Sequence, residues 1–274
     1  MRTELVNVNG IKIGGGNPFV LIAGPCVIES KEIVMKTAQG IKEITSELNI
    51  PFIFKSSYKK ANRTSDSSFV GIGDMEALDI LAEVKLKLKV PVITDIHTGA
   101  EAELAAQYVD ILQIPAFLCR QTELLKAAAK TGKVINIKKG QFLAPGDMKY
   151  AAEKVINAGN NKILFTERGS SFGYHNLVVD MRGLLIMKDL GFPVVMDATH
   201  SVQIPGQGGI TGGQSCYIKP IARAAVAVGI DALFLEVHPD PPNALSDAAS
   251  QLPLNELRDL LITVKSIDGI VKNI

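Results

Sequence analysis

The sequence predicts an α/β protein, a (β/α)8 TIM barrel with an N-terminal β-hairpin closing the bottom. Three observations favour this fold. Eight short apolar runs alternate with helical segments, polar side chains follow each run, and no glycine-rich dinucleotide turn follows the first run. An open doubly wound sheet gives a similar string of elements, but it concentrates its site at one switch point. We therefore expect one barrel domain over residues 1–274.

The predicted strands are short, apolar and followed by a reactive or hydrogen-bonding group. The runs and the polar residues that follow them are Phe19–Ala23 before Cys26, Phe52–Phe54 before Lys55, Val92–Thr94 before Asp95, Ile111–Leu112 before Gln113, Val134–Ile137 before Lys138, Ile163–Thr166 before Glu167 and Arg168, Val194–Met196 before Asp197 and His200, and Ala232–Leu235 before Glu236. Because the carboxyl ends of barrel strands meet at one rim, these side chains should line a single site.

Local signals define the remaining elements. Residues 6–13 alternate around Asn9-Gly10, the dipeptide that favours a type I′ hairpin, so we expect residues 1–17 to form a hairpin under the barrel. A helix should begin after the N-cap Ser30, and its predicted apolar face is Ile33, Thr37, Ile41 and Ile44. Further helices are expected near 74–88, 99–108, 121–131, 147–158, 178–190, 218–228 and 253–272.

Composition excludes several classes of protein. The 274 residues include 29 basic and 28 acidic side chains, so no global field favours nucleic acid or an anionic membrane as a partner. No apolar run is long enough to span a bilayer, and the N-terminus has no signal-peptide pattern, which predicts a cytoplasmic protein. Cys26, Cys119 and Cys216 have no framework spacing, so disulfides should not organise the fold.

The loop after the second predicted strand is rich in cations and hydroxyl groups. Residues 55–65 contain four lysine or arginine side chains together with Asn62, a set suited to phosphates, carboxylates and sugar hydroxyls. An exposed basic loop is the alternative. Lys55 favours the anion site, because it directly follows Phe52–Phe54 and should therefore lie at the rim.

Lys138 and Arg168 follow neighbouring predicted strands, where an ammonium beside a guanidinium can clamp a phosphate. Lys138 is alternatively a Schiff-base nucleophile. We expect Lys139 to point to solvent, and Glu167 either to face the site or to form an internal ion pair at the rim. Arg120, beyond the fourth strand, could bind an anion or cap the next helix.

Four side chains are candidate metal ligands: Cys26, His200, Glu236 and Asp247. They follow the first, seventh and eighth strands, and the first and eighth become neighbours when a barrel closes. A thiolate, an imidazole and two carboxylates suit Fe²⁺, Zn²⁺ or Mn²⁺. The alternative for a lone cysteine is a small core residue. His97, His175 and His238 are expected to be hydrogen-bonded or exposed.

Longer motifs resemble the 3-deoxy-D-manno-octulosonate-8-phosphate synthases, also named 2-dehydro-3-deoxyphosphooctonate aldolases. They are Ala23–Ser30, Lys60–Ser65, Gln113–Thr122, Lys138–Phe142, Thr166–Gly169, Phe172–Tyr174, Asp197–Ser201 and Ala244–Asp247, within a match from about residue 18 to 262. The resemblance implies an enzyme, a transferase that condenses phosphoenolpyruvate with D-arabinose 5-phosphate and water to 3-deoxy-D-manno-octulosonate 8-phosphate and phosphate. It also implies a (β/α)8 homotetramer serving lipopolysaccharide biosynthesis.

The resemblance further implies a role for each candidate residue. Lys138 and Arg168 would hold the phosphoenolpyruvate phosphate, with Lys55, Ser57 and Lys60 at the carboxylate. Asn62, Arg63 and Thr64 would contact the sugar phosphate, Gln113 and Asp95 would lie at the substrate, and Arg120 would reach in from a neighbouring subunit. Asp95 and His200 are the candidates for proton handling, beside Lys138 as the third catalytic residue.

The position of Cys26 distinguishes two classes in the resembled family. Metal-independent members have asparagine there and metal-dependent members cysteine, so Cys26, His200, Glu236 and Asp247 imply a divalent transition metal such as Fe, Zn, Mn or Co. Lys59, Val70 and His175 depart from the family pattern. We expect these departures to affect loops and subunit contacts, and not the reaction.

Three other functions are weighed against this one. The sister 3-deoxy-arabino-heptulosonate-7-phosphate synthases use erythrose 4-phosphate and typically have Lys-Pro-Arg-Thr in the second loop, where this chain has Lys60-Ala61-Asn62-Arg63-Thr64. A lysine-based aldolase would use Lys138. A non-catalytic sugar-phosphate-binding barrel would bind both substrates without turnover.

Overall fold

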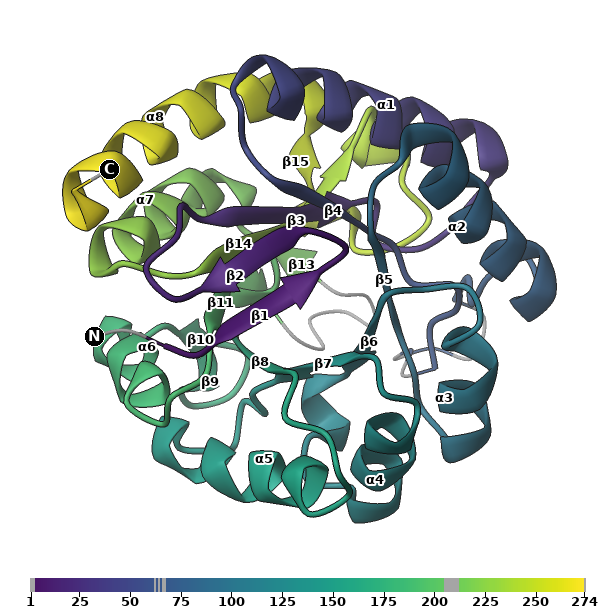
Figure 1. Cartoon of the computed structure of the whole chain (residues 1–274). Helices are drawn as coiled ribbons and strands as arrows, with labels where there is room; N and C mark the ends of the chain where they lie inside the picture. Colours follow the sequence, from purple (N-terminus) through teal and green to yellow (C-terminus); the bar gives the residue numbers. More distant parts are fainter. Residues whose placement is uncertain (1–2, 62, 64, 66–67, 205–211, 274) are drawn as a thin grey trace.

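The computed structural model describes residues 3–61, 63, 65, 68–204 and 212–273. Eight parallel strands form a ring that the pairing of β11 with β14 closes, so the predicted (β/α)8 barrel is confirmed (Figure 1). The barrel strands are β3 (Val20–Gly24), β4 (Phe52–Lys55), β5 (Val92–Asp95), β6 (Ile111–Ile114), β7 (Val134–Lys138), β8 (Ile163–Glu167), β11 (Val194–Asp197) and β14 (Ala232–His238).

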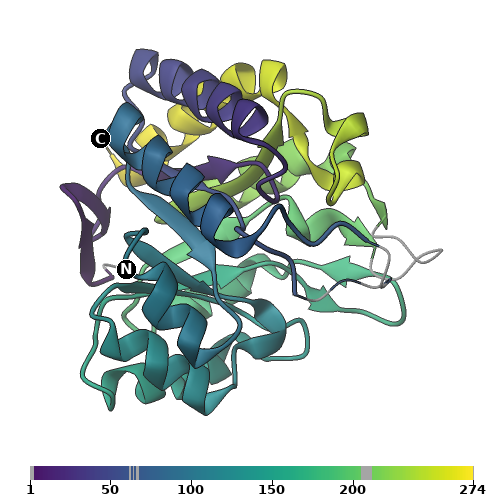
Figure 2. The same ribbon diagram turned by 90° about the vertical axis from the view of Figure 1, so that its right-hand side faces the viewer.

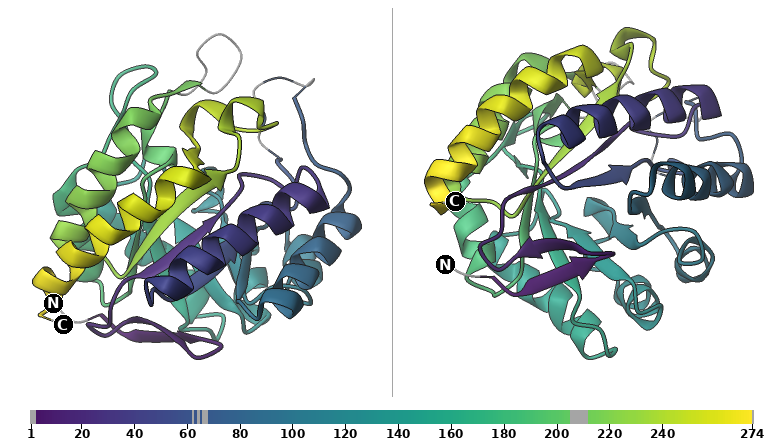
Figure 3. Two further views of the ribbon diagram at one scale, coloured as in Figure 1. Left: turned by 90° about the horizontal axis from the view of Figure 1, so that it is seen from above. Right: turned by 45° about the horizontal axis from the view of Figure 1, so that its top comes forward.

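The helices surround the ring. They are α1 (Lys31–Glu47), α2 (Asp74–Leu88), α3 (Gly99–Ala105), α4 (Thr122–Lys130), α5 (Met148–Ile156), α6 (Met181–Lys188), α7 (Ile218–Val228) and α8 (Leu254–Lys272). Figure 3 shows α8 alongside α1, so the helical layer closes as the sheet does. Among the described helices, none combines the length and the apolar character that a membrane crossing requires.

The first helix illustrates how local signals and packing combine. The Ser30 hydroxyl accepts a hydrogen bond of 3.2 Å from the Ile33 backbone N–H, which confirms the predicted N-cap. Thr37 and Ile41 are buried as predicted, but Ile33 and Ile44 are only partly buried. The buried face is centred on Val34, Thr37, Ala38, Ile41 and Thr45 instead.

The N-terminal hairpin closes one end of the barrel, as predicted. Its strands are β1 (Leu5–Val8) and β2 (Ile11–Gly14), and Asn9 and Gly10 have φ of 49° and 92°, as a type I′ turn requires. Figure 2 shows the purple hairpin across the barrel end. Val6, Val8 and Ile13 pack there against inward-pointing strand residues, so apolar contact seals this end.

The barrel interior changes from apolar to polar along seven of the eight strands, and β3 ends in Gly24 instead. Next to the hairpin lies a layer made of Ile53, Ile93, Ile111, Val134, Leu164, Val195 and Phe234. Side chains two positions further along a strand point to the same side. The next layer is therefore Lys55, Asp95, Gln113, Asn136, Thr166, Asp197 and Glu236, all buried. The polar rim that the sequence predicts is thus built on rigid strands.

Several two-residue strands lie at the polar end of the barrel. β9 (Ser170–Ser171) pairs with β10 (Leu177–Val178), β12 (Gln203–Ile204) pairs with β13 (Gly212–Gly213), and β15 (Leu252–Pro253) extends the sheet beside β14. The β14–β15 pairing holds the chain that follows Asp247, which places that residue above β14.

Candidate active site

A pocket of about 510 Å³ opens at the polar end of the barrel. Its lining is Lys55, Lys60, Asp95, His97, Pro115, Ala116, Phe117, Lys138, Gln141, Arg168 and His200. Six of these residues were site candidates from the sequence, and the lysines and Arg168 make the pocket suited to anions.

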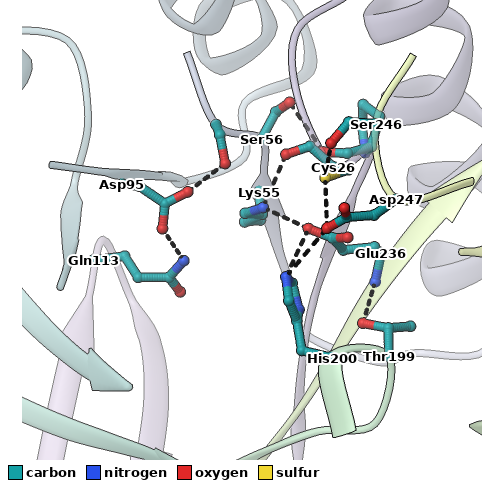
Figure 4. A network of polar contacts seen from close by, with 12 residues as sticks. Cys26, Lys55, Ser56, Asp95, Gln113, Thr199, His200, Glu236, Ser246 and Asp247 are labelled. Atoms are coloured by element: carbon teal, nitrogen blue, oxygen red, sulfur yellow. Dashed lines mark hydrogen bonds and ion pairs between the residues drawn. The ribbon is translucent and has the colours of Figure 1, made fainter. Parts of the chain in front are cut away.

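Asp95 is fixed at the pocket by a chain of buried hydrogen bonds. The Ser57 hydroxyl donates to one carboxylate oxygen. The Gln113 amide donates to the other (Figure 4). The Gln113 carbonyl accepts from the Asn136 amide at 2.9 Å, and Asn136 accepts from the Thr166 hydroxyl at 2.6 Å. Asn136 and Thr166 were not predicted as site residues. The alternation of inward and outward side chains along their strands is the signal that could have identified them.

Charge keeps Asp95 ionised. Burial by itself would raise the pKa of this carboxyl, but the nearby ammonium groups of Lys55, Lys60 and Lys138 outweigh burial and hold the pKa well below its usual range. Asp95 is therefore arranged to accept hydrogen bonds and to balance the cations of the pocket.

Asp197 links Lys138 to His200. One Asp197 oxygen lies 2.7 Å from Lys138 Nζ and 2.7 Å from His200 Nδ1. The other accepts the backbone N–H groups of Thr199 at 3.2 Å and His200 at 2.9 Å. Burial opposes ionisation of Asp197, but His200 and Lys138 hold its pKa well below the ordinary value. Asp197 was not among the predicted catalytic, substrate-binding or metal-binding residues, although it directly follows a predicted strand.

Three acidic side chains converge beside this pocket. One ligand atom each from Cys26, Glu236 and Asp247 lies within 4.8 Å of the others. His200 Nε2 is 3.5 Å from Glu236 and 3.9 Å from Asp247, so all four predicted metal ligands come together (Figure 4). Glu236 in β14 is paired in register with Gly24 in β3, which is how barrel closure brings it beside Cys26.

The chemistry of these four side chains fits a divalent metal. Burial, reinforced by the Asp247 and Glu236 carboxylates, outweighs the nearby Lys60 and Lys55 ammonium groups and raises the pKa of the Cys26 thiol well above its ordinary value. Glu236 Oε2 is buried and has no hydrogen bond among the described residues. Asp247 has a left-handed φ of 46°, a backbone strain that occurs at functional sites. A thiolate, an imidazole and carboxylates are ligands for borderline transition metals.

Two cations connect the cluster with the pocket. Lys55 Nζ donates to Glu236 at 2.9 Å and to the Cys26 carbonyl at 3.1 Å, and it is almost fully buried. Arg168 donates from one terminal nitrogen to Gln203 at 3.0 Å, while its other, Nη1, is buried without a hydrogen bond among the described residues. A buried guanidinium with an unused donor at a pocket is arranged for an anionic ligand.

Other predicted residues lie elsewhere. Arg120 is exposed and lines a separate hollow with Asp147 and Tyr150, so a single chain does not bring it to the pocket. Arg63 donates to the Phe69 carbonyl at 2.8 Å and lies 3.7 Å from Asp247. Asn62 and Thr64 lie outside the described residues.

The prediction for Lys139 is wrong. This lysine is fully buried, donates to the Ser170 hydroxyl at 3.0 Å and lies 3.6 Å from Glu167. Glu167 in turn accepts the backbone N–H groups of Arg168 and Gly169 at 3.0 Å and 2.6 Å. Neighbouring residues of a strand point to opposite faces, so Lys138 enters the barrel while Lys139 packs behind it. Glu167 thus forms the internal ion pair, with Lys139 as its partner.

Comparisons with known proteins identify the family. A model described as the DAHP synthetase I family matches residues 2–273. The chain therefore belongs to the DAHP synthetase I family. It is 55% identical over 271 residues to the 2-dehydro-3-deoxyphosphooctonate aldolase of Geobacter metallireducens, which covers 98% of this chain and 100% of that protein.

Further members of this family have the same name. The 2-dehydro-3-deoxyphosphooctonate aldolase of Azoarcus sp. is 54% identical over 98% of this chain and 97% of its own length. That of Aromatoleum aromaticum is 56% identical over 96% of this chain and 95% of its own length. The resemblance that the motifs indicate is confirmed over nearly the whole chain.

Proposed function

We propose that this enzyme condenses phosphoenolpyruvate with D-arabinose 5-phosphate and water, giving 3-deoxy-D-manno-octulosonate 8-phosphate and phosphate, a step of lipopolysaccharide biosynthesis. The observation that carries the proposal is the convergence of Lys55, Lys60, Lys138 and Arg168 on one pocket beside a metal-competent cluster. Two phosphorylated substrates, one also a carboxylate, need this many cations in a desolvated site. The names of the relatives over nearly full length support the same reaction.

The positions of the hydrogen-bond donors in and around the pocket suggest where each substrate group binds. Arg168 Nη1 and Lys138 would bind the phosphoenolpyruvate phosphate, and Lys55, Lys60 and Ser57 its carboxylate. Arg63, with Asn62 and Thr64, would bind the sugar phosphate. Arg120 would complete that end from a neighbouring subunit of a homotetramer, which fits its exposed position outside the pocket of its own chain.

Bond formation follows from charge and proximity. Carbon 3 of the enol phosphate attacks the aldehyde carbon, water adds at carbon 2 as cationic character develops there, and the C–O bond to phosphate breaks. Clamps at both substrates hold the reacting carbons at attack distance, which converts an intermolecular reaction into one within a complex. Lys138 and Arg168 stabilise the charge that builds on the departing phosphate.

Proton handling falls to Asp95 and His200. Asp95 is held ionised and so would accept a hydrogen bond from a substrate hydroxyl or from water. Asp197 fixes the His200 ring through Nδ1, which leaves Nε2 directed at Glu236 and Asp247. Cys26, His200, Glu236 and Asp247 would hold a divalent Fe, Zn, Mn or Co ion. Such an ion, when bound, supplies Lewis acidity at the reacting oxygen atoms.

The test compares two sugars. Phosphate release from phosphoenolpyruvate should depend on arabinose 5-phosphate and should stop when a chelator is added. Release that depends on erythrose 4-phosphate instead would favour the sister heptulosonate synthase, whose typical second-loop motif this chain lacks. Binding of both substrates without turnover would point to a non-catalytic barrel.

A lysine-based aldolase is disfavoured by geometry, because Lys138 Nζ lies 2.7 Å from the Asp197 carboxylate and is engaged in that contact instead of being free to attack a carbonyl. Borohydride with substrate should therefore leave Lys138 unlabelled. We further propose a cytoplasmic, single-domain subunit in a homotetramer, and light scattering coupled to gel filtration tests the assembly.

A further inference from the structure

A charged network lies beside the pocket, among residues with no role in the proposal above. Lys59 lies on the loop after β4, and its Nζ is 3.0 Å from Asp74 in the first turn of α2 and 3.0 Å from Glu101 in the first turn of α3. Glu101 reaches on to His97, which lines the pocket. Lys59 is one of the positions at which the sequence departs from the resembled family.

The contacts between Glu101 and His97 are specific. One carboxylate oxygen of Glu101 accepts both the His97 backbone N–H at 2.8 Å and the ring Nδ1 at 2.9 Å. The other oxygen of the same carboxylate is the one that lies against Lys59. The ammonium thus holds the carboxylate in the orientation that serves His97, and it shares its charge with Asp74.

This arrangement selects one tautomer of the ring. Burial by itself would raise the pKa of Glu101, but the hydrogen bonds from His97, Tyr58 and Lys59 outweigh burial and hold that pKa below its ordinary value. An ionised carboxylate only accepts, so the proton of neutral His97 must be on Nδ1. Nε2 is then an acceptor, and it has no hydrogen bond among the described residues.

We propose that Glu101, oriented by Lys59, positions His97 so that Nε2 accepts a hydrogen bond from a hydroxyl group of the aldose phosphate. This deepens the proposed function and rests on it. Lys55, Lys60, Lys138 and Arg168 are donors that suit phosphate and carboxylate, whereas sugar hydroxyl groups also need acceptors. Both oxygens of Asp95 already accept hydrogen bonds from protein groups, so an acceptor at His97 adds capacity that phosphoenolpyruvate does not use.

The tautomer can be observed without turnover. In the ¹⁵N-labelled full-length protein, long-range ¹H–¹⁵N correlation identifies Nε2 of His97 by its coupling to both ring C–H protons. We expect an unprotonated Nε2 in the wild-type protein and a shift toward protonated Nε2 in Glu101→Gln, whose amide can also donate. A protonated Nε2 in the neutral wild-type ring would overturn the positioning role.

Kinetics then test the substrate contact. One lost hydrogen bond of about 1–1.5 kcal/mol corresponds to about a 5–13-fold change in affinity. We expect Glu101→Gln and His97→Phe to raise the KM for arabinose 5-phosphate by about this factor, with the KM for phosphoenolpyruvate within twofold. Asp74→Asn is the matched control, since it removes the other partner of Lys59 and leaves the Glu101–His97 contact intact.

The outcomes separate the two proposals. An equal rise in both KM values, or no change in Glu101→Gln, overturns the contact while leaving the reaction in place. A wild-type protein that releases no phosphate overturns the proposed function, and the substrate contact falls with it. The tautomer measurement still decides the positioning role in that case.

Discussion

The buried pair behind the rim offers a sharp test of how the pocket is supported. Lys139→Met removes an ammonium that donates to the carbonyls of Gly140 and Leu143 at 3.3 Å and to Ser170 at 3.0 Å. Three acceptors losing about 1 kcal/mol each give about 3 kcal/mol of lost stability. This agrees with the low end of the roughly 3–5 kcal/mol expected when one partner of a buried ion pair is removed.

A double-mutant cycle isolates the pair. Glu167→Gln should also destabilise, because Lys139 then lacks its nearby carboxylate. The double variant removes both charges and should cost less than the sum of the single variants by about 1–3 kcal/mol. The chain has no tryptophan, so urea unfolding is followed by circular dichroism.

Lys36→Met is the matched control for this cycle, since Lys36 is exposed on α1. It should change stability by at most about 0.5 kcal/mol. Costs that add to within about 0.5 kcal/mol in the double variant would refute the coupling between Lys139 and Glu167.

Three further predictions concern metal, polar packing and pH. Cys26→Ser should lose bound metal, measured by mass spectrometry of the purified protein after gel filtration, with unchanged circular dichroism; a full equivalent of metal would contradict this. Asn136→Leu leaves the Gln113 carbonyl without its donor and should cost about 1–3 kcal/mol in urea unfolding, whereas an unchanged midpoint would show that the chain of amides is dispensable. Burial lowers the pKa of Lys139 below its ordinary 10.5, so the unfolded chain binds more protons between the two values. Stability should therefore rise with pH across that window, relative to Lys139→Met, and a flat difference would argue against a depressed pKa.

The sequence predicted the barrel and most of its rim because both follow from local pattern. The parallel strands of a barrel all end at one rim, so a polar residue that follows an apolar run is predicted to lie at that rim. Asn136 and Thr166 are not predicted as site residues because they lie inside the predicted strands Val134–Ile137 and Ile163–Thr166, and not after them. Alternation correctly separates Lys139 from Lys138, but the prediction that Lys139 points to solvent is wrong because the chain around Leu143 and Ser170 covers that face.

Contacts between loops could not be predicted from local sequence patterns. Lys59 contacts Glu101 because the loop after β4 lies next to the start of α3. No spacing of residues in the sequence predicts this contact. Glu236 lies in β14, whereas the other candidate metal ligands, Cys26, His200 and Asp247, lie in connections outside the strands. No short ligand motif joins these residues, so resemblance was needed to favour them. The left-handed backbone of Asp247 is likewise set by its surroundings.

Strand alternation also limits how this chain can change in length. Lys138, the last residue of β7, enters the barrel, and Lys139, which directly follows the strand, packs on the opposite side. Deleting a single residue of β7 would therefore direct Lys139 into the barrel in place of Lys138. The same holds wherever an apolar residue and a rim group are two apart, as with Ile93 and Asp95. Insertions and deletions should therefore be tolerated in the connecting loops and selected against within strands, because the length of each strand determines which side chain enters the active site.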